Sequence, residues 1–118
     1  EAHYCDVNCS FGWKQASVNG VFARLAAVGS FAKNISHCGA VDMAGNAGEW
    51  TSTLYRGYPY KADDEREALD AEGIRSVRGG SWSNRSLFLR GADRFQAEPS
   101  ARNDNLGFRI VVEAVPGQ

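Results

Sequence analysis

The segment VDMAGNAGEWT, residues 41–51, is the first of four short blocks that decide the fold of this chain. The others are RGGSW at 78–82, LRGADR at 89–94 and NLGFR at 105–109. Each block sets glycine close to arginine or to an aromatic side chain. Glycine lets one backbone approach another closely, and aromatic rings bury large areas. The blocks therefore predict a turn-rich domain built around a few aromatic anchors.

Size and charge limit the possible classes of protein. The chain has 118 residues, with 13 Lys and Arg against 14 Asp and Glu and a net charge of −1. This length predicts one domain over residues 1–118. The mixed charges argue against a nucleic-acid partner, and no apolar run approaches the roughly 18 residues of a membrane span. We expect neither nucleic-acid binding nor membrane insertion, and the compartment stays open.

Alternation with a period of two predicts β-strands in four places. The clearest is 105–113, expected as a central strand, and 48–55, 75–82 and 87–93 are further candidates. Together they predict an antiparallel sheet. Within 48–55 the alternation separates two faces: Trp50, Ser52 and Leu54 against Glu49, Thr51 and Thr53.

Helical signals are weaker than strand signals. Residues 63–72 combine helix-forming side chains with acidic residues in the first turn, and residues 20–27 are Ala-rich but few. The expected class is therefore α+β with few short helices.

The three cysteines leave two interpretations open. Because Cys5, Cys9 and Cys38 are an odd number, at most one internal disulfide forms, and one thiol stays free or pairs between chains. Cys5 and Cys9 could instead join His3, or His37 with Cys38, in a zinc site. A lone Cys-x3-Cys spacing is a weak zinc signal, so ordinary buried or exposed thiols are the simpler interpretation.

In their order and spacing, the four blocks resemble the formylglycine-generating enzyme, or sulfatase-modifying factor, superfamily. The resemblance runs from Tyr4 to Val112 and corresponds to the C-terminal part of the family's longer domain. It implies an irregular, loop-rich α+β fold of the C-type lectin-like kind, with an antiparallel sheet and few short helices. It also implies that the family's preceding N-terminal segment is one partner of this chain.

The resemblance implies a calcium site formed by Asp42, Gly45, Ala47 and Glu49. Two carboxylates and two backbone carbonyls from one tight turn suit Ca²⁺, which prefers oxygen and tolerates irregular geometry. The alternative is a β-turn in which Asp42 caps the local backbone and Glu49 pairs with an arginine. We expect calcium here as a structural cofactor.

A second calcium site of the family would involve Asp6, Val7 and Phe22. Its other acidic ligand falls at Gly20, which has no side-chain oxygen, and Asn19 is only a neutral substitute. We therefore expect this second site to be weak or empty.

The reactive centre of the family is missing from this sequence. In the oxidase, two cysteines after the Gly-Gly-Ser segment bind copper(I), which needs soft thiolates, and oxidise a substrate cysteine to formylglycine. The resemblance aligns them with Asn84 and the vicinity of Leu89, so no copper is expected. The iron-binding histidines of the ergothioneine-forming relatives lie on a separate helical domain, and this sequence has only His3 and His37. The sequence favours a non-catalytic chain, with a sulfatase-modifying oxidoreductase, or a fragment of one, as the alternative.

Loops on a rigid frame are typical of recognition surfaces. In one branch of the superfamily, the variable proteins of diversity-generating retroelements, the C-terminal segment varies while Gly-Gly-Ser-Trp and Leu-Gly-Phe-Arg hold the frame. Anchoring Phe and Arg beside short polar side chains suit a protein or surface ligand. By this resemblance the recognition surface consists of Ser83, Asn84, Arg85, Ser86, Phe88, Asp93, Phe95, Gln96, Arg102, Asn103 and Asp104. Leu87 lies among them, and it and Phe88 could equally be core residues.

Two further roles stay open. The segments 98–100 and 103–104 are reminiscent of calcium-dependent sugar sites, although Ser100 lacks the amide carbonyl that such a site needs. A mainly structural role, with the chain packed against an enzymatic partner or its own N-terminal segment, predicts a large exposed apolar patch.

Overall fold

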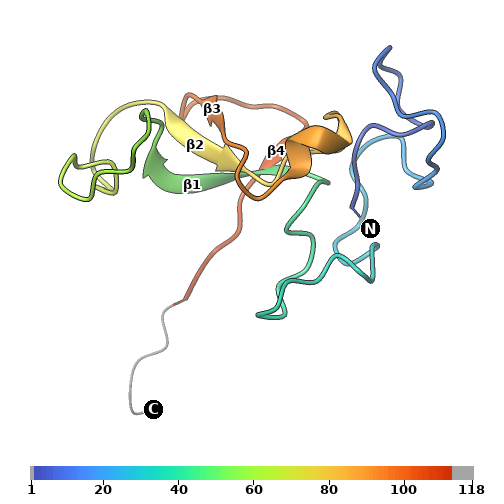
Figure 1. Cartoon of the computed structure of the whole chain (residues 1–118), viewed down its shortest axis with the longest axis horizontal. Helices are drawn as coiled ribbons and strands as arrows, with labels where there is room; N and C mark the ends of the chain where they lie inside the picture. Colours follow the sequence, from blue (N-terminus) through green and yellow to red (C-terminus); the bar gives the residue numbers. More distant parts are fainter. Residues whose placement is uncertain (1, 113–118) are drawn as a thin grey trace.

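The computed structural model describes residues 2–112. Its regular elements are β1 (Gly48–Leu54), β2 (Arg75–Arg78), the 3-10 helix η1 (Ser86–Leu89), β3 (Phe95–Ala97) and β4 (Leu106–Gly107). The strands form one sheet in the order β3-β2-β1-β4 (Figure 1). β2 pairs antiparallel with both β1 and β3, whereas β4 runs parallel to β1.

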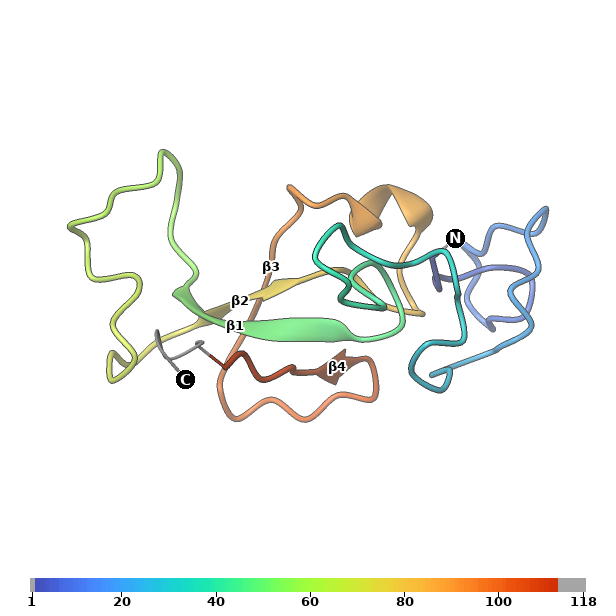
Figure 2. The same ribbon diagram turned by 90° about the horizontal axis from the view of Figure 1, so that it is seen from below.

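Long loops surround this small sheet. The β1–β2 loop extends from one end, and the N-terminal loops lie at the other end (Figures 1 and 2). The N-terminal part is joined to the block at 41–51 by an isolated bridge between His3 and Gly45. The molecule is therefore consistent with a loop-rich α+β class, with η1 as the helix of the described residues, and the C-type lectin-like topology stays a prediction.

Backbone hydrogen bonds connect the blocks that the sequence singled out. Gly45 N donates to Gly79 O at 2.8 Å, and Trp82 N donates to Asn46 O at 2.9 Å. Gly48 N donates to Asn105 O at 2.9 Å. The glycine-rich segments at 41–51, 78–82 and 105–109 thus meet at one place, as their capacity for close approach predicted.

Two of the strand predictions are confirmed. β1 and β2 fall within 48–55 and 75–82, and their pairing sets Trp50 opposite Val77 and Glu49 opposite Arg78. The register shifts between Trp50 and Leu54, and at its two ends it agrees with the predicted faces, because Trp50 and Leu54 pair with Val77 and Arg75, two residues apart on β2.

The prediction for 105–113 is wrong in length, position and direction. β4 covers only Leu106–Gly107, lies at the sheet edge and pairs parallel with β1, so the sheet is mixed and not antiparallel. After β4 the chain leaves the sheet, with Phe108, Ile110, Val111 and Val112 exposed (Figure 1). Alternation detected an extended segment but could not show whether a partner strand lies beside it. Glu113 lies outside the described residues.

The predicted strand at 87–93 is also wrong. Ser86–Leu89 form η1, closed by a hydrogen bond from Phe88 N to Arg85 O at 3.0 Å. A Cβ on Gly80 would lie 2.5 Å from Leu89 Cδ2 and 2.9 Å from Phe88 O, so this helix packs directly on the glycine backbone. The strand in this region is β3 (Phe95–Ala97). Its three residues are too few for an alternating pattern to reveal it in the sequence.

No helix forms at 63–72. The Asp64 Oδ1 accepts the backbone N–H of Arg66 at 3.1 Å, which competes with helical hydrogen bonding. Glu65 has a φ of 58°, outside the helical region. Residues 20–27 also form bends and irregular backbone and no helix.

The cysteine alternatives are resolved by the geometry. Cys5 and Cys9 form a disulfide and are buried, while Cys38 is a free, exposed thiol. Cys5 and Cys9 therefore offer no thiolates to zinc. Within residues 2–112, no helix has the length and apolar character to span a membrane.

Candidate functional site

The first candidate site is the turn that leads from Asp42 to Glu49 at the start of β1. Gly45 has a φ of 83°, and a Cβ at this position would lie 2.0 Å from the His3 carbonyl oxygen. Only glycine fits such a contact. With Gly45 N also bonded to Gly79 O at 2.8 Å, the turn is held from both sides by backbone.

The two carboxylates of this turn have different environments. Asp42 is 8% exposed, its Oδ2 accepts the Gly29 N–H at 2.7 Å, and its Oδ1 is buried without a hydrogen-bond partner. Glu49 receives two hydrogen bonds from Arg109, with Nε 2.6 Å from Oε2 and Nη2 on Oε1. The hydrogen bond to Glu49 raises the pKa of Arg109. The arginine partner of the alternative interpretation is therefore Arg109.

All four predicted calcium ligands line one cavity of about 260 Å³. These residues are Asp42, Gly45, Ala47 and Glu49. A buried carboxylate oxygen without a partner is a group that a bound cation would satisfy. Three or more His, Cys, Asp or Glu side chains gather nowhere in residues 2–112, so a cation here would rely on backbone oxygens, which Ca²⁺ accepts. The residues present fit calcium.

The second predicted calcium site has a different geometry. Asp6 is buried, and its Oδ1 accepts the backbone N–H of Asn8 at 2.8 Å. Its Oδ2 accepts the backbone N–H of Gly20, where a Cβ would lie only 2.7 Å from that oxygen. Both carboxylate oxygens are engaged by N–H donors, so this site lacks the orphaned oxygen that distinguishes Asp42.

Part of the predicted recognition surface gathers around a cavity of about 150 Å³ on the sheet face that carries Val77. Four predicted residues line it: Asn84, Phe95, Gln96 and Asn103. The Phe95 ring also packs edge-on against the ring of Phe88 on η1, with centroids 6.0 Å apart. No charged side chain lines this cavity, so its character is amide-rich with one aromatic wall.

Two other predicted residues, Ser83 and Asp104, line a second cavity of about 520 Å³. Its wall includes Trp82 and Phe11, whose rings stack with centroids 5.9 Å apart. Arg24 lies over Trp82 at 5.4 Å and forms an ion pair with Asp104. The cavity thus joins the C-terminal loops to the N-terminal ones.

The remaining predicted residues lie outside both cavities. Ser86 Oγ bonds to Gln15 Oε1 at 3.1 Å, and Asp93 forms an ion pair with Arg90 at 2.9 Å. Arg102 donates to the Pro99 and Ala101 carbonyls, and Arg85 is exposed. Leu87 and Phe88 are exposed as well, so neither is a core residue.

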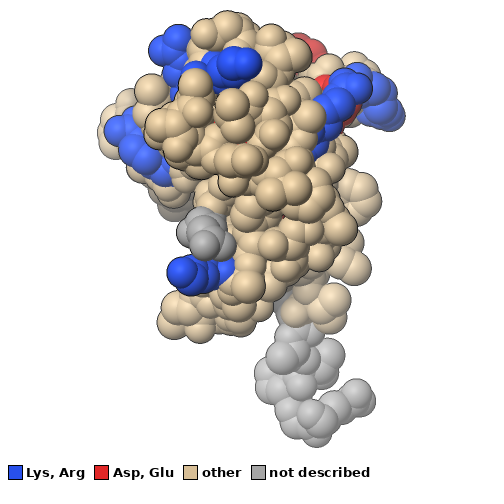
Figure 3. Space-filling model, turned by 90° about the vertical axis from the view of Figure 1, so that its right-hand side faces the viewer, with Lys and Arg blue, Asp and Glu red and all other residues tan. Residues whose placement is uncertain are grey.

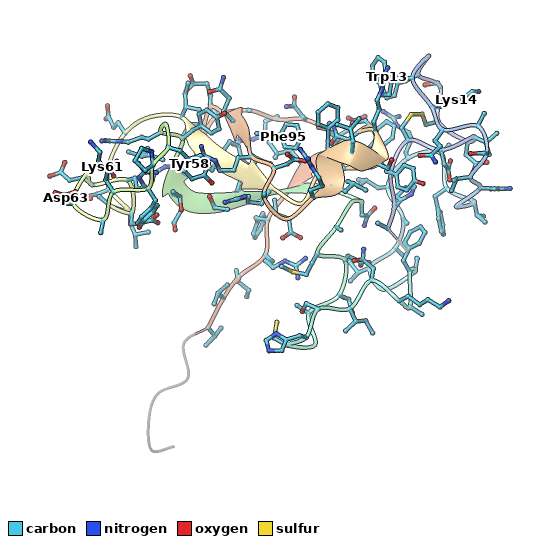
Figure 4. All side chains as sticks on the ribbon, viewed as in Figure 1. Trp13, Lys14, Tyr58, Lys61, Asp63 and Phe95 are labelled. Carbon is cyan, nitrogen blue, oxygen red and sulfur yellow. A yellow bond between two sulfur atoms is a disulfide. The ribbon has the colours of Figure 1, made fainter. Side chains whose placement is uncertain are left out.

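Sequence reasoning missed the aromatic wall supplied by the N-terminal loop. Phe11 stacks on Trp13 with centroids 4.6 Å apart, and Trp13 Nε1 donates to Ser83 O at 2.9 Å. Trp13 lies at the outer end of that loop (Figure 4). Figure 3 views this end of the molecule, where uncharged residues cover most of the surface and Lys and Arg lie in separate groups. The sequence feature that could have indicated this wall is the pair of Phe11 and Trp13, two aromatic residues spaced two apart in a polar loop.

The positions that the resemblance assigns to copper ligands hold other chemistry. Asn84 Oδ1 accepts hydrogen bonds from Ser81 N at 2.9 Å and Ser81 Oγ at 2.8 Å. Leu89 packs on Gly80. The free thiol of the described residues, Cys38, has its pKa lowered chiefly by the hydrogen bond with Ser36. Two adjacent thiolates are therefore not present in this part of the chain.

The structure thus consists of a small sheet among long loops, with the glycine-rich blocks bonded to one another. The chain belongs to the sulfatase-modifying factor enzyme 1-like domain family, which matches residues 4–114. This match confirms the resemblance drawn from the four blocks.

Several longer proteins are similar to this chain. Hercynine oxygenase of Mycolicibacterium thermoresistibile is 32% identical over 103 residues, covering 80% of this chain and 23% of that protein. Hercynine oxygenase of Mycobacterium tuberculosis is 33% identical over 99 residues, with the same coverage of 80% and 23%. Serine/threonine-protein kinase pkn1 of Chlamydia caviae is 37% identical over 76 residues, covering 60% of this chain and 12% of that protein. The chain thus spans less than a quarter of these curated relatives, and no solved structure matches it.

Proposed function

We propose that this chain is a non-catalytic ligand-binding unit of the formylglycine-generating enzyme superfamily, with the C-type lectin-like topology of that superfamily. The observation that carries the proposal is that the two copper-binding cysteines of the family fall, by resemblance, at Asn84 and in the vicinity of Leu89, where the sequence has no cysteine. Asn84 is engaged in the hydrogen bonds that hold the Ser81 turn, so it acts as a structural residue of the loop. Without the copper-binding thiolates, the domain retains a frame that carries loops, which is the usual architecture of a recognition site.

The ligand would bind at the two cavities lined by the recognition residues. The larger one combines stacked rings of Phe11 and Trp82 with the ion pair between Arg24 and Asp104. Aromatic anchors beside adaptable polar groups are enriched where proteins bind proteins. We therefore propose a protein or surface ligand, as in the variable proteins of diversity-generating retroelements, and neither nucleic acid nor membrane insertion.

The first experiment tests the non-catalytic assignment directly. The purified chain is titrated with copper(I) and incubated with a sulfatase-derived peptide that contains the substrate cysteine. We expect no stoichiometric copper binding and no formylglycine by mass spectrometry. Turnover that is lost on Cys38→Ser would refute the proposal. In parallel, a reverse-transcriptase gene and a template repeat in the neighbouring DNA would support the retroelement assignment.

We also propose calcium as a structural cofactor of the turn at 42–49. The orphaned Asp42 Oδ1 and the cavity shared with Glu49 support it. Asp42, Glu49 and the backbone oxygens of Gly45 and Ala47 would hold the ion, which would fix the turn at the start of β1. Arg109 would then share Glu49 with the ion.

A second candidate function follows from the relatives. The chain is about a third identical to two hercynine oxygenases and spans 23% of their length. In that case it would supply loops to an oxidoreductase whose metal is bound elsewhere in a longer protein. Iron(II)- and hercynine-dependent oxygen consumption by the longer protein, abolished by substitutions at Asn84 and Phe95, would favour this function over the first.

The exposed apolar run at 108–112 supports the proposal that another protein segment packs against this chain. Phe108, Ile110, Val111 and Val112 are exposed side by side after β4. An exposed apolar run of this kind is usually covered by another protein segment. We propose the preceding segment of the family's longer domain as that partner.

A further inference from the structure

The sheet has a polar face that the proposed recognition surface does not use. Thr51 and Thr53 of β1 line the same cavity as Ser76 and Arg78 of β2, so these four side chains share one face of the sheet. The hydroxyl of Thr51 donates to Ser76 O at 3.0 Å across the two strands. Three hydroxyls and one guanidinium therefore lie together on this face.

Residues of the β1–β2 loop and of this polar face together line a cavity of about 120 Å³. The cavity is lined from the sheet by Thr51, Thr53, Ser76 and Arg78, and from elsewhere by Tyr58, Tyr60, Arg66, Glu67 and Arg94. Tyr58 belongs to the loop end of the molecule, opposite the end at which Trp13 lies (Figure 4). The cavity is therefore separate from the one lined by Trp82.

Ser76 is the unusual member of this lining. It is 1% exposed, and its Oγ has no hydrogen-bond partner. A buried hydroxyl without a partner is costly, and such groups are usually satisfied by a water or a ligand. Ser76 is one of the residues that line the cavity, and its hydroxyl is the buried group there without a hydrogen-bond partner.

Two of the arginines keep an uncompensated charge. Arg78 donates to the Gly91 and Asp93 carbonyls at 3.0 and 3.1 Å, and Arg94 donates to the Arg56 carbonyl at 3.0 Å. Among the described residues, neither forms an ion pair. Carbonyl contacts fix the direction of a guanidinium but leave its positive charge available to an anion.

The aromatic rings position Arg94 further. Its guanidinium lies 4.1 Å from the centroid of the Tyr58 ring and 4.9 Å from that of Tyr55. Stacking of this kind holds the planar group rigid, so less entropy is lost when it binds a ligand.

The acidic lining residue is already engaged. Glu67 accepts hydrogen bonds from Thr53 at 2.9 Å and from Tyr60 at 3.4 Å. Arg66 is paired with Asp64 at 2.6 Å, so the two cancel in charge. The charges that remain in the lining are those of Arg78 and Arg94, which are positive, and that of Glu67, which is negative. The cavity therefore has an excess of positive charge.

We propose that this cavity is a binding site for a small oxyanion, either a phosphate or sulfate group or the carboxylate of a larger ligand. Its volume of about 120 Å³ is well above the roughly 10–15 Å³ that one water needs, which leaves room for one such group. Arg78 and Arg94 would supply charge, and Ser76 would supply a hydroxyl donor. The site is independent of the recognition surface and of calcium.

The test is a titration of the purified chain with inorganic phosphate, sulfate and acetate, followed by calorimetry and by NMR at constant ionic strength. We expect saturable binding of at least one of them at millimolar concentration. Preference for phosphate or sulfate identifies a tetrahedral oxyanion, and preference for acetate identifies a carboxylate. Absence of saturable binding for all three would overturn the proposal.

Four variants make the test specific to the cavity. We expect Arg94→Gln to weaken binding about ten-fold and Ser76→Ala about three-fold, since charge-assisted hydrogen bonds are the stronger ones. Glu67→Gln removes the opposing charge and is expected to strengthen binding a few-fold. Lys61→Gln removes an exposed positive charge from the same loop and serves as the matched control.

The control separates a site from a general electrostatic effect. If Lys61→Gln weakens binding as much as Arg94→Gln does, the anion is attracted by the loop as a whole and the proposal is wrong. If Arg94→Gln does not fold by circular dichroism, Glu67→Gln decides, because unchanged or weaker binding by that folded variant would also contradict the site.

Discussion

Asp42 combines two costs in one residue. Its φ of 56° lies in the left-handed region, which costs a non-glycine residue on the order of 1–2 kcal/mol, and its Oδ1 is buried without a partner. Residues that carry strain and an unsatisfied group together are retained when a ligand compensates them. The neighbouring Gly45, which no side chain could replace without meeting His3, fixes the same turn. These two features of Asp42 are the basis of the proposed calcium site.

Removal of calcium is the first prediction at the residue scale. We expect a chelator to lower the melting temperature by several degrees, because a ligand at 100 times its Kd stabilises the folded state by about 2.7 kcal/mol. Asp42→Asn and Glu49→Gln should abolish the difference between chelator and added calcium in differential scanning calorimetry. The control is Asp63→Asn, because Asp63 is an exposed carboxylate at the other end of the molecule. This variant should keep the difference in melting temperature between chelator and added calcium.

The ion pair offers the competing explanation for the same turn. If Glu49 served only Arg109, Glu49→Gln would lower the melting temperature equally with and without calcium, and the chelator would have no effect on the unmodified chain. That pair of results would show that Arg109 alone holds the turn.

The acid sensitivity of the β1–β2 loop is the second prediction, and it concerns one element. Arg66 donates to both oxygens of Asp64, with Nη2 2.6 Å from Oδ2, and this hydrogen bonding lowers the pKa of Asp64 from 3.8 to about 2. Because the folded pKa is the lower one, the stabilising contribution is present above pH 3.8 and is lost as the pH falls toward about 2.

The measurement is urea unfolding over that pH range. The free energy of unfolding of Asp64→Asn should fall less steeply with decreasing pH than that of the unmodified chain. Asp63→Asn removes the adjacent exposed carboxylate and should keep the original slope. Equal slopes for Asp64→Asn and the unmodified chain would mean that this pair does not contribute to stability.

At the element scale, sequence patterns predicted the longest strand correctly. They failed for elements whose formation depends on contacts with other parts of the chain. Alternation over 48–55 gave β1 and both of its faces, because seven residues carry a clear period. β3 and β4 have three and two residues, too few for any period, and their pairing depends on partners distant in sequence. The helix expected at 63–72 failed because the Asp64 side chain competes for a backbone N–H, a local contact that composition does not contain.

The candidate site follows the same division. The four residues that the resemblance assigns to calcium lie within one turn of eight residues, and they line one cavity. The aromatic wall joins Phe11 and Trp13 to Trp82 across about seventy residues of chain, and no local pattern connects them. Ser76 was not singled out either, since a serine in a strand is ordinary until its hydroxyl is found without a partner.

For the whole molecule, the decisive feature is how much apolar surface the chain leaves uncovered. The buried apolar side chains of the described residues are few: Cys5, Cys9, Leu54, Val77 and Trp82. A domain of this size is only marginally stable with so small a core. The exposed run at 108–112 would add substantially to that core if another segment covered it, at about 25 cal/mol for each Å² buried.

Self-association of the purified chain is the third prediction, and it tests this view of the surface. With no covering segment, exposed apolar residues in an extended chain should pair between copies, so we expect concentration-dependent association in analytical ultracentrifugation. The double substitution Ile110→Lys and Val112→Lys should restore a monomer without lowering the melting temperature. Leu69→Lys is the matched control, because Leu69 is 80% exposed, against 81% for Ile110 and 82% for Val112, but lies in the β1–β2 loop. If the unmodified chain is monomeric at every concentration, or if Leu69→Lys disperses it equally well, the run at 108–112 is not the adhesive surface. The domain would then not need a partner there.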